Sequence, residues 1–463
     1  MTLIKSISGI RGTIGGEIGN NLTPIDIVEC TAGFGIWIKK RHKNPIVVVG
    51  RDGRITGKMV SDLATNTLIA MGIDVIDLGL STTPTVEIAV PLEKASAGII
   101  FTASHNPKQW NALKFVNHEG EFISAADGQE ITDYINEGNL IFSEVDNLGS
   151  VSYRNDYIDI HINQILALDF LNIDNIKSAN FSVVVDCINS TGAISVPPLL
   201  EQLGCQVHLI NEEITGDFAH NPEPKPENLK QLSKAVIAAK ADLGISIDPD
   251  VDRLAFVNED GTMFGEEYTL VAIADSILTS KKGNTVSNLS STRALADVTK
   301  KHGGKYTASA VGEVNVVNAM KASNAVIGGE GNGGVILPDL HYGRDALVGI
   351  ALMLNLLAKK GVSISELKKS YPAYTIVKDK IELTDDIDAD KLLNQMAEMF
   401  KDENISTIDG VKIDYTHGWV HMRRSNTEAI IRVYSESTDA VKAQNLVDKM
   451  KEQMTKFIAV KSK

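Results

Sequence analysis

Three aspartates occupy alternating positions in the segment Asp248-Pro-Asp250-Val-Asp252-Arg253, directly after the apolar run 243–247. Carboxylates this close repel one another unless a cation lies among them, so a bound divalent metal ion is the simplest explanation. An EF-hand calcium loop is excluded, because Arg253 stands where that loop requires glycine and strand-like runs flank the segment. A solvated acidic turn is the alternative.

Ser104 lies in the segment Phe-Thr-Ala-Ser-His-Asn-Pro-Lys (101–108), which follows a short apolar run. The segment lacks the GxSxG pattern of a hydrolase nucleophile. We expect His105 to point away from Ser104, because consecutive residues of an extended chain face opposite sides. If the metal site lies nearby, a phosphorylated serine is attractive, since a divalent cation would neutralise the phosphoryl charge.

A glycine-rich loop, Gly-Gly-Glu-Gly-Asn-Gly-Gly (328–334), contains a formal GxGxxG pattern. A dinucleotide-binding fingerprint should open a helix, but the chain continues with the extended run 335–338, so this match is weak. Glu330 and Asn332 instead offer the hydrogen bonds that sugar hydroxyls require. A tight structural turn is the alternative for this loop taken alone.

A second polar loop, Met-Arg-Arg-Ser-Asn-Thr-Glu-Ala (422–429), is rich in phosphate-binding groups. Arg423 supplies a guanidinium, Ser425 and Thr427 supply hydroxyls, and Asn426 supplies an amide, and together they match the oxygens of a phosphate. An isolated Arg-Arg pair is usually surface charge. The Ser-Asn-Thr that follows it favours an anion site.

Composition limits the partners that these loops can serve. The chain has 463 residues, a hydrophobic fraction of 43% and a formal net charge of −14, which indicates several globular domains and argues against nucleic acid or an anionic membrane as the main partner. The three cysteines show no CxxC spacing, which favours a reducing compartment. No apolar signal segment opens the chain, and its longest apolar run, 346–358, is too short for a bilayer, so we expect a cytoplasmic protein.

The elements that must position the loops follow a repeated pattern. Residues 45–79, 181–210 and 284–310 each read as a strand, a polar loop, an amphipathic helix and a second strand. We therefore predict an α/β protein with three similar domains of mixed sheet and a C-terminal α+β domain, whose final helix is capped by Thr438. The predicted domains are 1–150, 151–255, 256–372 and 373–463.

Together these loops resemble the α-D-phosphohexomutase family. TASHNP with Asn111 and Lys114 is similar to its phosphoserine loop, and the segments at 248–253, 328–334 and 423–432 are similar to its magnesium, sugar and phosphate loops. SGIRG (8–12) and GRDGRITG (50–57) resemble its N-terminal motifs. The matches occur in the family order through all four domains, which implies a central cleft that receives one loop from each domain.

The resemblance implies a role for each matching residue. Ser104 would be the phosphoserine and would hold one Mg²⁺ per chain together with Asp248, Asp250 and Asp252. The residues implied to bind substrate are Glu330 and Asn332 for sugar hydroxyls, and Arg423, Ser425, Asn426, Thr427 and Arg432 for the unreacting phosphate. The residues implied to assist proton transfer and to steady the transferring group are Lys114, Arg11 and Arg253.

The implied reaction interconverts hexose 6-phosphates and 1-phosphates through a hexose 1,6-bisphosphate, which also serves as activator. The ASHNP form of the serine loop favours phosphoglucosamine mutase over a phosphomannomutase/phosphoglucomutase. A metal-dependent phosphatase and a non-catalytic sugar-phosphate-binding protein are less favoured, because the serine, metal and phosphate segments all match a mutase. We expect a small phosphosugar as the partner, and a monomer or homodimer.

Some positions depart from the family pattern. The bacterial sugar loop often reads ExSGH, but Asn332 replaces its serine and Gly334 its histidine. Ala112 replaces a common glycine, and Ala310 stands where a lysine is common. A proton-transfer role sometimes given to the histidine is therefore unfilled or belongs to another residue.

Overall fold

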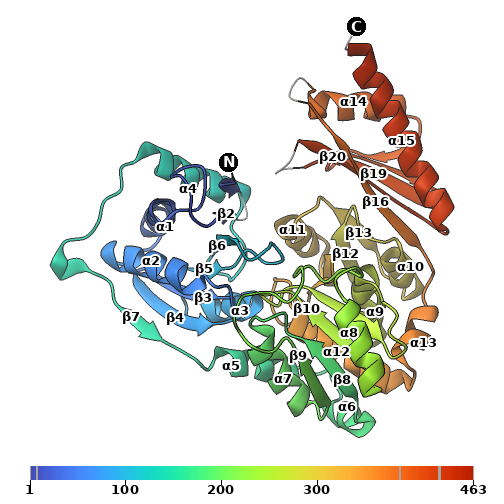
Figure 1. Ribbon diagram of the computed structural model, residues 1–463, viewed down its shortest axis with the longest axis horizontal. Helices are drawn as coiled ribbons and strands as arrows, with labels where there is room; N and C mark the ends of the chain where they lie inside the picture. Colours follow the sequence, from blue (N-terminus) through green and yellow to red (C-terminus); the bar gives the residue numbers. More distant parts are fainter. Residues whose placement is uncertain (1, 7–8, 385–386, 426–428, 462–463) are drawn as a thin grey trace.

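The computed structural model describes residues 2–6, 9–384, 387–425 and 429–461, which form four sheets with flanking helices (Figure 1). Three of the sheets mix parallel and antiparallel strands, and the fourth is wholly antiparallel. The predicted fold class, three α/β domains followed by an α+β domain, is confirmed.

The N-terminal sheet has the strand order β1-β2-β6-β5-β3-β4-β7. The predicted strand–helix–strand unit at 45–79 is present, and its two strands are parallel neighbours. The elements are β1 (Ile4–Ser6), β2 (Gly9–Thr13), α1 (Pro24–Lys39), β3 (Ile46–Arg51), α2 (Gly57–Ala70), β4 (Asp74–Leu80), α3 (Thr83–Leu92), β5 (Ala97–Phe101), β6 (Trp110–Val116), α4 (Ala125–Glu137), η1 (Val145–Asn147) and β7 (Val151–Tyr153).

The second sheet has the order β11-β10-β8-β9 and the third the order β13-β12-β14-β15. In both, the predicted unit supplies a parallel strand pair. The elements of the second are α5 (Tyr157–Leu166), α6 (Ile173–Ala179), β8 (Ser182–Asp186), α7 (Gly192–Gln202), β9 (Gln206–Ile210), α8 (Lys230–Ala239), β10 (Leu243–Ile247) and β11 (Leu254–Asn258). Those of the third are α9 (Glu266–Ser280), β12 (Asn284–Asn288), α10 (Ala294–Lys301), β13 (Tyr306–Ser309), α11 (Glu313–Ser323), β14 (Ala325–Glu330), β15 (Gly334–Ile336), α12 (Ala346–Lys360) and α13 (Ile364–Lys369).

Helix α12 joins the second and third domains into one apolar core. It packs against α5, α6 and α7 on one side and α9 on the other, so it is buried almost all round and its sequence is apolar on every face. The Asp345 carboxylate caps its first turn by accepting the N–H groups of Leu347 (2.8 Å) and Val348 (3.2 Å). This burial explains the apolar run at 346–358. No helix within the described residues is both long and apolar enough to cross a membrane.

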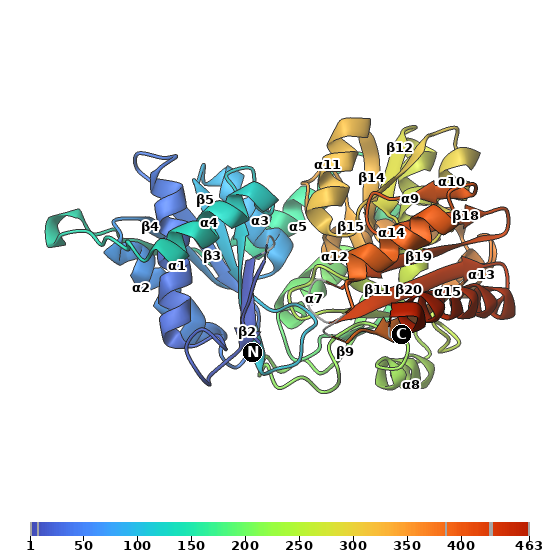
Figure 2. The same ribbon diagram turned by 90° about the horizontal axis from the view of Figure 1, so that it is seen from above.

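The C-terminal sheet has the order β16-β20-β19-β18-β17 and lies beside the third domain (Figures 1 and 2). Its elements are β16 (Thr375–Glu382), α14 (Ala389–Met399), β17 (Asn404–Ser406), β18 (Val411–Tyr415), β19 (Gly418–Arg424), β20 (Ile430–Ser437) and α15 (Ala440–Lys461). The predicted Thr438 cap is wrong: Asp439 accepts the N–H of Lys442 at 2.8 Å, and the helix starts at Ala440.

Polar contacts fix this last domain against the third. Arg293 donates to the carbonyl oxygens of Tyr415 (3.2 Å) and Gly418 (3.1 Å), and its own N–H donates to Glu436 (3.0 Å). The partners on the C-terminal side come from β18, the start of β19 and β20. The C-terminal sheet is therefore anchored to the third domain.

A buried charged cluster joins the first three domains. His161 of α5 and His341 of the β15–α12 loop both contact the Asp345 Oδ2 atom, at 2.8 and 3.3 Å, and Nδ1 of His341 lies 3.4 Å from the carboxylate of Glu87 in α3. Burial raises the pKa of Glu87 to about 8. Burial opposes the charge of His341, but its bonds to Asp345 and Glu87 outweigh this and raise its pKa to about 9.

This cluster should make the free energy of unfolding fall as the pH rises. In the unfolded chain, glutamate and histidine release their protons near pH 4.5 and 6.5, whereas in the folded cluster Glu87 keeps its proton to about pH 8 and His341 to about pH 9. The stabilisation is complete below about pH 4.5. It is lost by about 1.4 kcal/mol per pH unit between about 4.5 and 6.5, where the folded cluster holds one proton more than the unfolded chain, and by about 2.8 kcal/mol per unit between about 6.5 and 8, where it holds two more. Urea titrations of the wild type and of Glu87→Gln should show a flatter pH profile for the variant. The exposed Glu137→Gln is the control, and an unchanged slope in Glu87→Gln would contradict the assignment.

Candidate active site

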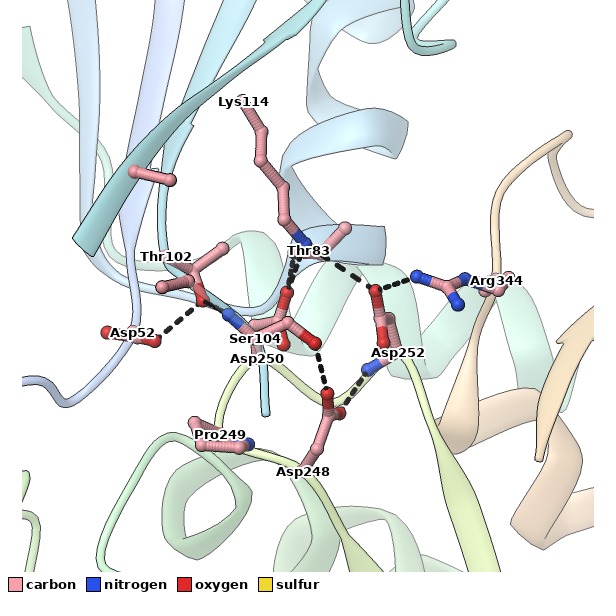
Figure 3. Close-up of polar contacts among 12 residues, drawn as sticks. Asp52, Thr83, Thr102, Ser104, Lys114, Asp248, Pro249, Asp250, Asp252 and Arg344 are labelled. Carbon is pink, nitrogen blue, oxygen red and sulfur yellow. Dashed lines mark hydrogen bonds and ion pairs between the residues drawn. The ribbon is translucent and has the colours of Figure 1, made fainter. Parts of the chain in front are cut away.

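Ser104 stands in the loop between β5 and β6, with its side chain directed at the metal loop (Figure 3). Its φ of +49° lies in the left-handed region, which is uncommon for a residue other than glycine, and the residue is buried. Its backbone N–H donates to Thr102 Oγ1 (2.9 Å), and its hydroxyl donates to Asp248 Oδ2 (2.7 Å). The surrounding structure thus holds the serine in a strained conformation of the kind that clusters at functional sites.

The expectation that His105 points away from Ser104 is wrong. It assumed an extended chain, whereas the left-handed backbone of Ser104 brings His105 Nδ1 to 3.3 Å from Ser104 Oγ. Burial and the positive charges of Arg253 and Arg344 keep the pKa of His105 well below its usual range. The imidazole is therefore neutral at pH 7.

Arg54 holds the serine loop (101–108) by hydrogen bonds to its main chain. It is 1% exposed, and Nε donates to Asp52 Oδ2 at 3.0 Å. Its remaining donors bond the main-chain carbonyl oxygens of Ser104, Asn106, Pro107 and Trp110. The Asp52 carboxylate in turn accepts from Thr102 (2.6 Å). The buried guanidinium of Arg54 therefore holds the conformation of the serine loop. Arg54 belongs to the GRDGRITG motif.

Replacing Arg54 by alanine should destabilise the protein by about 3–5 kcal/mol, because the change removes the cation that pairs with the buried Asp52 and leaves four carbonyl oxygens without their guanidinium donor. Urea denaturation measures this loss. Arg41→Ala is the matched control, since Arg41 makes surface pairs with Asp127 and Glu130, and it should cost less than about 1 kcal/mol. Equal losses in the two variants would contradict the role of Arg54.

The aspartate loop follows β10 and turns back into β11. Val251 sits at its centre with a φ of +62°, an outlier for a β-branched residue, and this turn brings the three carboxylates together. One carboxylate oxygen from each of Asp248, Asp250 and Asp252 lies within 4.8 Å of the others, and all three residues are buried.

The three carboxylates fit a divalent cation. Within the described residues, Oδ1 of Asp250 and Oδ1 of Asp252 are buried and accept no hydrogen bond. Burial and the charges of Asp252 and Asp250 keep the pKa of Asp248 well above its usual range. Oxygen ligands of this kind suit Mg²⁺ or Ca²⁺. The described residues contain one further group that could hold a metal, His161, His341 and Asp345, whose contacts are those of the buried cluster above.

Lys114 bridges the first domain to the aspartate loop. Its Nζ lies 2.8 Å from Asp250 and 3.6 Å from Asp252, and Thr83 Oγ1 donates to the same Asp250 oxygen at 2.6 Å (Figure 3). Burial opposes the ammonium charge, but the two aspartates outweigh it and raise the pKa of Lys114. The lysine is therefore a fixed cation beside the serine.

Arg11 and Arg253 add positive charge. Arg11 of β2 is directed by its strand into the same region, and its Nε atom is buried with no hydrogen-bond partner among the described residues. Burial and the charge of Arg432 lower its pKa. Arg253 lies 3.4 Å from Glu223 and 3.9 Å from Asp252. Cations placed this way suit a phosphate-bearing ligand.

A cavity of about 870 Å³ opens onto these groups. The predicted residues that line it are Arg11, Ser104, Lys114, Arg253 and Glu330. Its described lining comes from the first three domains, and its volume is in the range of small-molecule sites. The structure therefore brings residues of the serine, aspartate and sugar loops to one cavity, whereas the resemblance implied a cleft that receives a loop from all four domains.

The sugar loop contributes Glu330 at the end of β14. Its carboxylate accepts from Asn288 (2.9 Å), from the N–H of Gly312 (3.2 Å) and from Arg344 (3.0 Å). Burial opposes its ionisation, but Arg344 outweighs burial and lowers the pKa of Glu330. Asn332 does not line the cavity; its side-chain oxygen accepts the N–H of Gly334 at 3.2 Å.

The described residues of the phosphate loop do not line the cavity. Arg423 pairs with Asp409 at 3.2 Å, the Ser425 N–H donates to the Ile430 carbonyl at 3.0 Å, and Arg432 is opposite Arg423 in the β19–β20 register. None of Arg423, Ser425 and Arg432 lines the cavity. The predicted residues Asn426 and Thr427 lie outside the described residues.

Sequence reasoning missed several residues of the site. Arg344 contacts Asp252 at 2.6 Å and Glu313 at 2.9 Å, and both Arg344 and Glu313 line the cavity. Thr83, at the first turn of α3, was missed as well. Arg344 and Thr83 each lie at or just before a helix start that follows a strand, a position where ligand-binding side chains gather in α/β proteins, so this signal could have found them.

Comparison with known proteins identifies the family of the chain. Four profiles of the phosphoglucomutase/phosphomannomutase family match in order: α/β/α domain I at residues 3–141, domain II at 157–261, domain III at 265–374 and the C-terminal domain at 377–453. The chain is 34% identical over 445 residues to a phosphoglucomutase/phosphomannomutase of Thermococcus kodakarensis, covering 95% of this chain and 96% of the relative. A probable phosphoglucosamine mutase of Methanopyrus kandleri is 34% identical over 446 residues and 95% of each chain.

Solved structures share the fold. A phosphoglucomutase/phosphomannomutase family protein of Burkholderia thailandensis has a TM-score of 0.84 at 26% identity, covering 97% of this chain and 96% of its own. An N-acetylphosphoglucosamine mutase of Aspergillus fumigatus, solved with GlcNAc-6P and magnesium, has a TM-score of 0.58 at 15% identity over 97% and 95%. The chain therefore belongs to the phosphoglucomutase/phosphomannomutase family and is a phosphohexomutase.

Proposed function

We propose that the protein interconverts glucosamine 6-phosphate and glucosamine 1-phosphate through a phosphorylated Ser104 and a 1,6-bisphosphate. The observation that supports this most directly is that Ser104 and Lys114 contact the three buried aspartates and line a cavity that Glu330 also lines. Curated relatives that carry a phosphoglucosamine mutase name, and the ASHNP form of the serine loop, favour glucosamine phosphates.

Asp248, Asp250 and Asp252, with the Ser104 phosphate, would hold Mg²⁺. The ion would supply charge neutralisation for a phosphoryl group at Ser104. The distant relative solved with magnesium and a hexosamine phosphate supports this choice of metal. Lys114 and Arg253 would steady the transferring phosphoryl group from the protein side.

The proposed reaction consists of two phosphoryl transfers, one from Ser104 and one back to it. The bond between the Ser104 oxygen and phosphorus breaks, the free sugar hydroxyl oxygen bonds to phosphorus, and its proton leaves to a base while the serine oxygen regains a proton. The bisphosphate then turns, and Ser104 accepts the other phosphoryl group by the reverse step. Lys114 would remain cationic beside the transferring group, because Asp250 and Asp252 raise its pKa, and Glu330 is suited to hold sugar hydroxyls in both orientations.

The unreacting phosphate needs a second anion site. Arg11 has a buried Nε without a partner among the described residues, and the charge of Arg432 already acts on it across the cleft. We assign this phosphate to Arg11 together with Arg423, Ser425, Asn426, Thr427 and Arg432. The C-terminal domain would approach the cavity when the phosphate binds, since none of its described residues lines the cavity.

A substrate panel tests the proposal. Glucosamine, glucose and mannose 6-phosphates are supplied with Mg²⁺ and a trace of the corresponding 1,6-bisphosphate, and the 1-phosphates and inorganic phosphate are measured. We expect isomerisation, with kcat/KM highest for glucosamine 6-phosphate. A preference of orders of magnitude for glucose or mannose 6-phosphate would replace the proposed substrate, as the phosphoglucomutase/phosphomannomutase relative suggests. Release of phosphate without isomerisation would indicate a phosphatase.

A further inference from the structure

Gly334 ends the sugar loop where the family motif often carries histidine, and the structure shows what fills that space. A Cβ atom at residue 334 would lie 2.3 Å from Cδ and 3.0 Å from Cγ of Arg344. The backbone of Gly334 lies in β15 and outside the left-handed region, so any residue could adopt its conformation. Glycine is required here for space alone, and the side chain of Arg344 occupies that space.

The guanidinium of Arg344 joins three carboxylates from separate segments. Its Nη2 lies 2.6 Å from Asp252 in the aspartate loop, Nη1 lies 3.0 Å from Glu330 in the sugar loop, and Nε lies 2.9 Å from Glu313 at the start of α11. The backbone N–H of Arg344 also donates to Glu313, at 3.1 Å. Arg344 is 8% exposed and lines the cavity.

We propose that Arg344 is a positioning residue of the mutase reaction, which takes the space of a side chain at residue 334 and fixes Glu330 relative to Asp252. This inference rests on the proposed function. A planar guanidinium is the one side chain that can bond three carboxylates at fixed angles. Glu330, the proposed sugar contact, and Asp252 of the aspartate loop lie in different domains. Arg344 sets the distance between them, and an in-line phosphoryl transfer depends on that distance.

The pair Gly334 and Arg344 permits a double-mutant cycle. Gly334→Ala should displace Arg344, so Gly334→Ala, Arg344→Ala and the double variant should each lower kcat/KM by about 10- to 100-fold, with the double variant no worse than Arg344→Ala. Arg344→Lys keeps the charge, but one ammonium nitrogen cannot span the three carboxylates that Nη2, Nε and Nη1 of Arg344 reach, and the variant should stay at least about 10-fold impaired. Gly57→Ala is the matched glycine control, because a Cβ there meets no atom closer than 3.4 Å.

Two further readouts separate this inference from the proposed function. Thermal unfolding of the same variants should show that Gly334→Ala destabilises the wild type but not the Arg344→Ala background. Calorimetric titration with glucosamine 6-phosphate should show weaker binding to Arg344→Ala.

Four outcomes would overturn the positioning role: additive losses in kcat/KM, full activity of Gly334→Ala, full rescue by lysine, or unchanged binding in Arg344→Ala. A wild type that isomerises no hexose phosphate would remove the proposed function, and the titration would then decide the role of Arg344 alone.

Discussion

Replacing Ser104 by alanine should lower the mutase activity by a factor on the order of 1,000 or more, because the proposed reaction passes both phosphoryl transfers through this one oxygen. The structure places the Ser104 side chain at the aspartate loop. Its hydroxyl contacts Asp248 at 2.7 Å, and its strained backbone is held by the loop that Arg54 supports. The measurement is the rate of 1-phosphate formation with Mg²⁺ and bisphosphate present.

Intact-protein mass spectrometry supplies the second half of this test. The wild type incubated with glucose or glucosamine 1,6-bisphosphate should gain the mass of one phosphoryl group, and Ser104→Ala should not. Ser178→Ala, an exposed serine on α6, is the control and should behave as the wild type. Full activity of Ser104→Ala, or a phosphoryl group that persists in it, would refute the phosphoserine mechanism.

The sequence predicted the elements of the site better than their contacts. Each loop follows a short apolar strand, and strand–helix–strand units have few alternative arrangements, so the sheets could be predicted from the pattern. The meeting of the loops in one cleft was implied only by the resemblance to the phosphohexomutase family. Asp248, Asp250 and Asp252 could be predicted as a group because their mutual repulsion is local in sequence.

Other features depend on contacts between distant segments. Arg344 is 92 residues from Asp252, and only the packing of α12 between the second and third domains brings them together. The error about His105 has a similar origin, since the left-handed backbone of Ser104 is imposed by Arg54, fifty residues earlier. Neither effect leaves a periodic pattern in the sequence.

Removing divalent metal should abolish the activity, and Mg²⁺ should restore it. The reason is that the three buried carboxylates lie together beside the serine. Lys114 contacts Asp250 and Asp252, and Arg344 contacts Asp252, at distances below 4 Å. Neither of these two cations contacts Asp248 at such a distance, so the negative charge of the group is only partly balanced. A chelator should lower the rate by a factor on the order of 100 to 1,000. Mg²⁺ at about one hundred times its Kd should stabilise the folded protein by about 2.7 kcal/mol, which thermal or urea unfolding can measure.

The variant Asp248→Asn tests the metal site by the direction in which its stability changes. Burial and two like charges raise the pKa of Asp248, so its ionised form is costly in the absence of metal. The metal-free variant should therefore unfold at the same or a higher temperature than the metal-free wild type, yet gain little from Mg²⁺ and show little activity. Asp62→Asn, at an exposed surface pair, should keep the full response to Mg²⁺. If Asp248→Asn gained as much stability from Mg²⁺ as the wild type, the metal would have to bind elsewhere. Asp248 contacts Ser104 in the proposed site, so the loss of its carboxylate should weaken metal binding there.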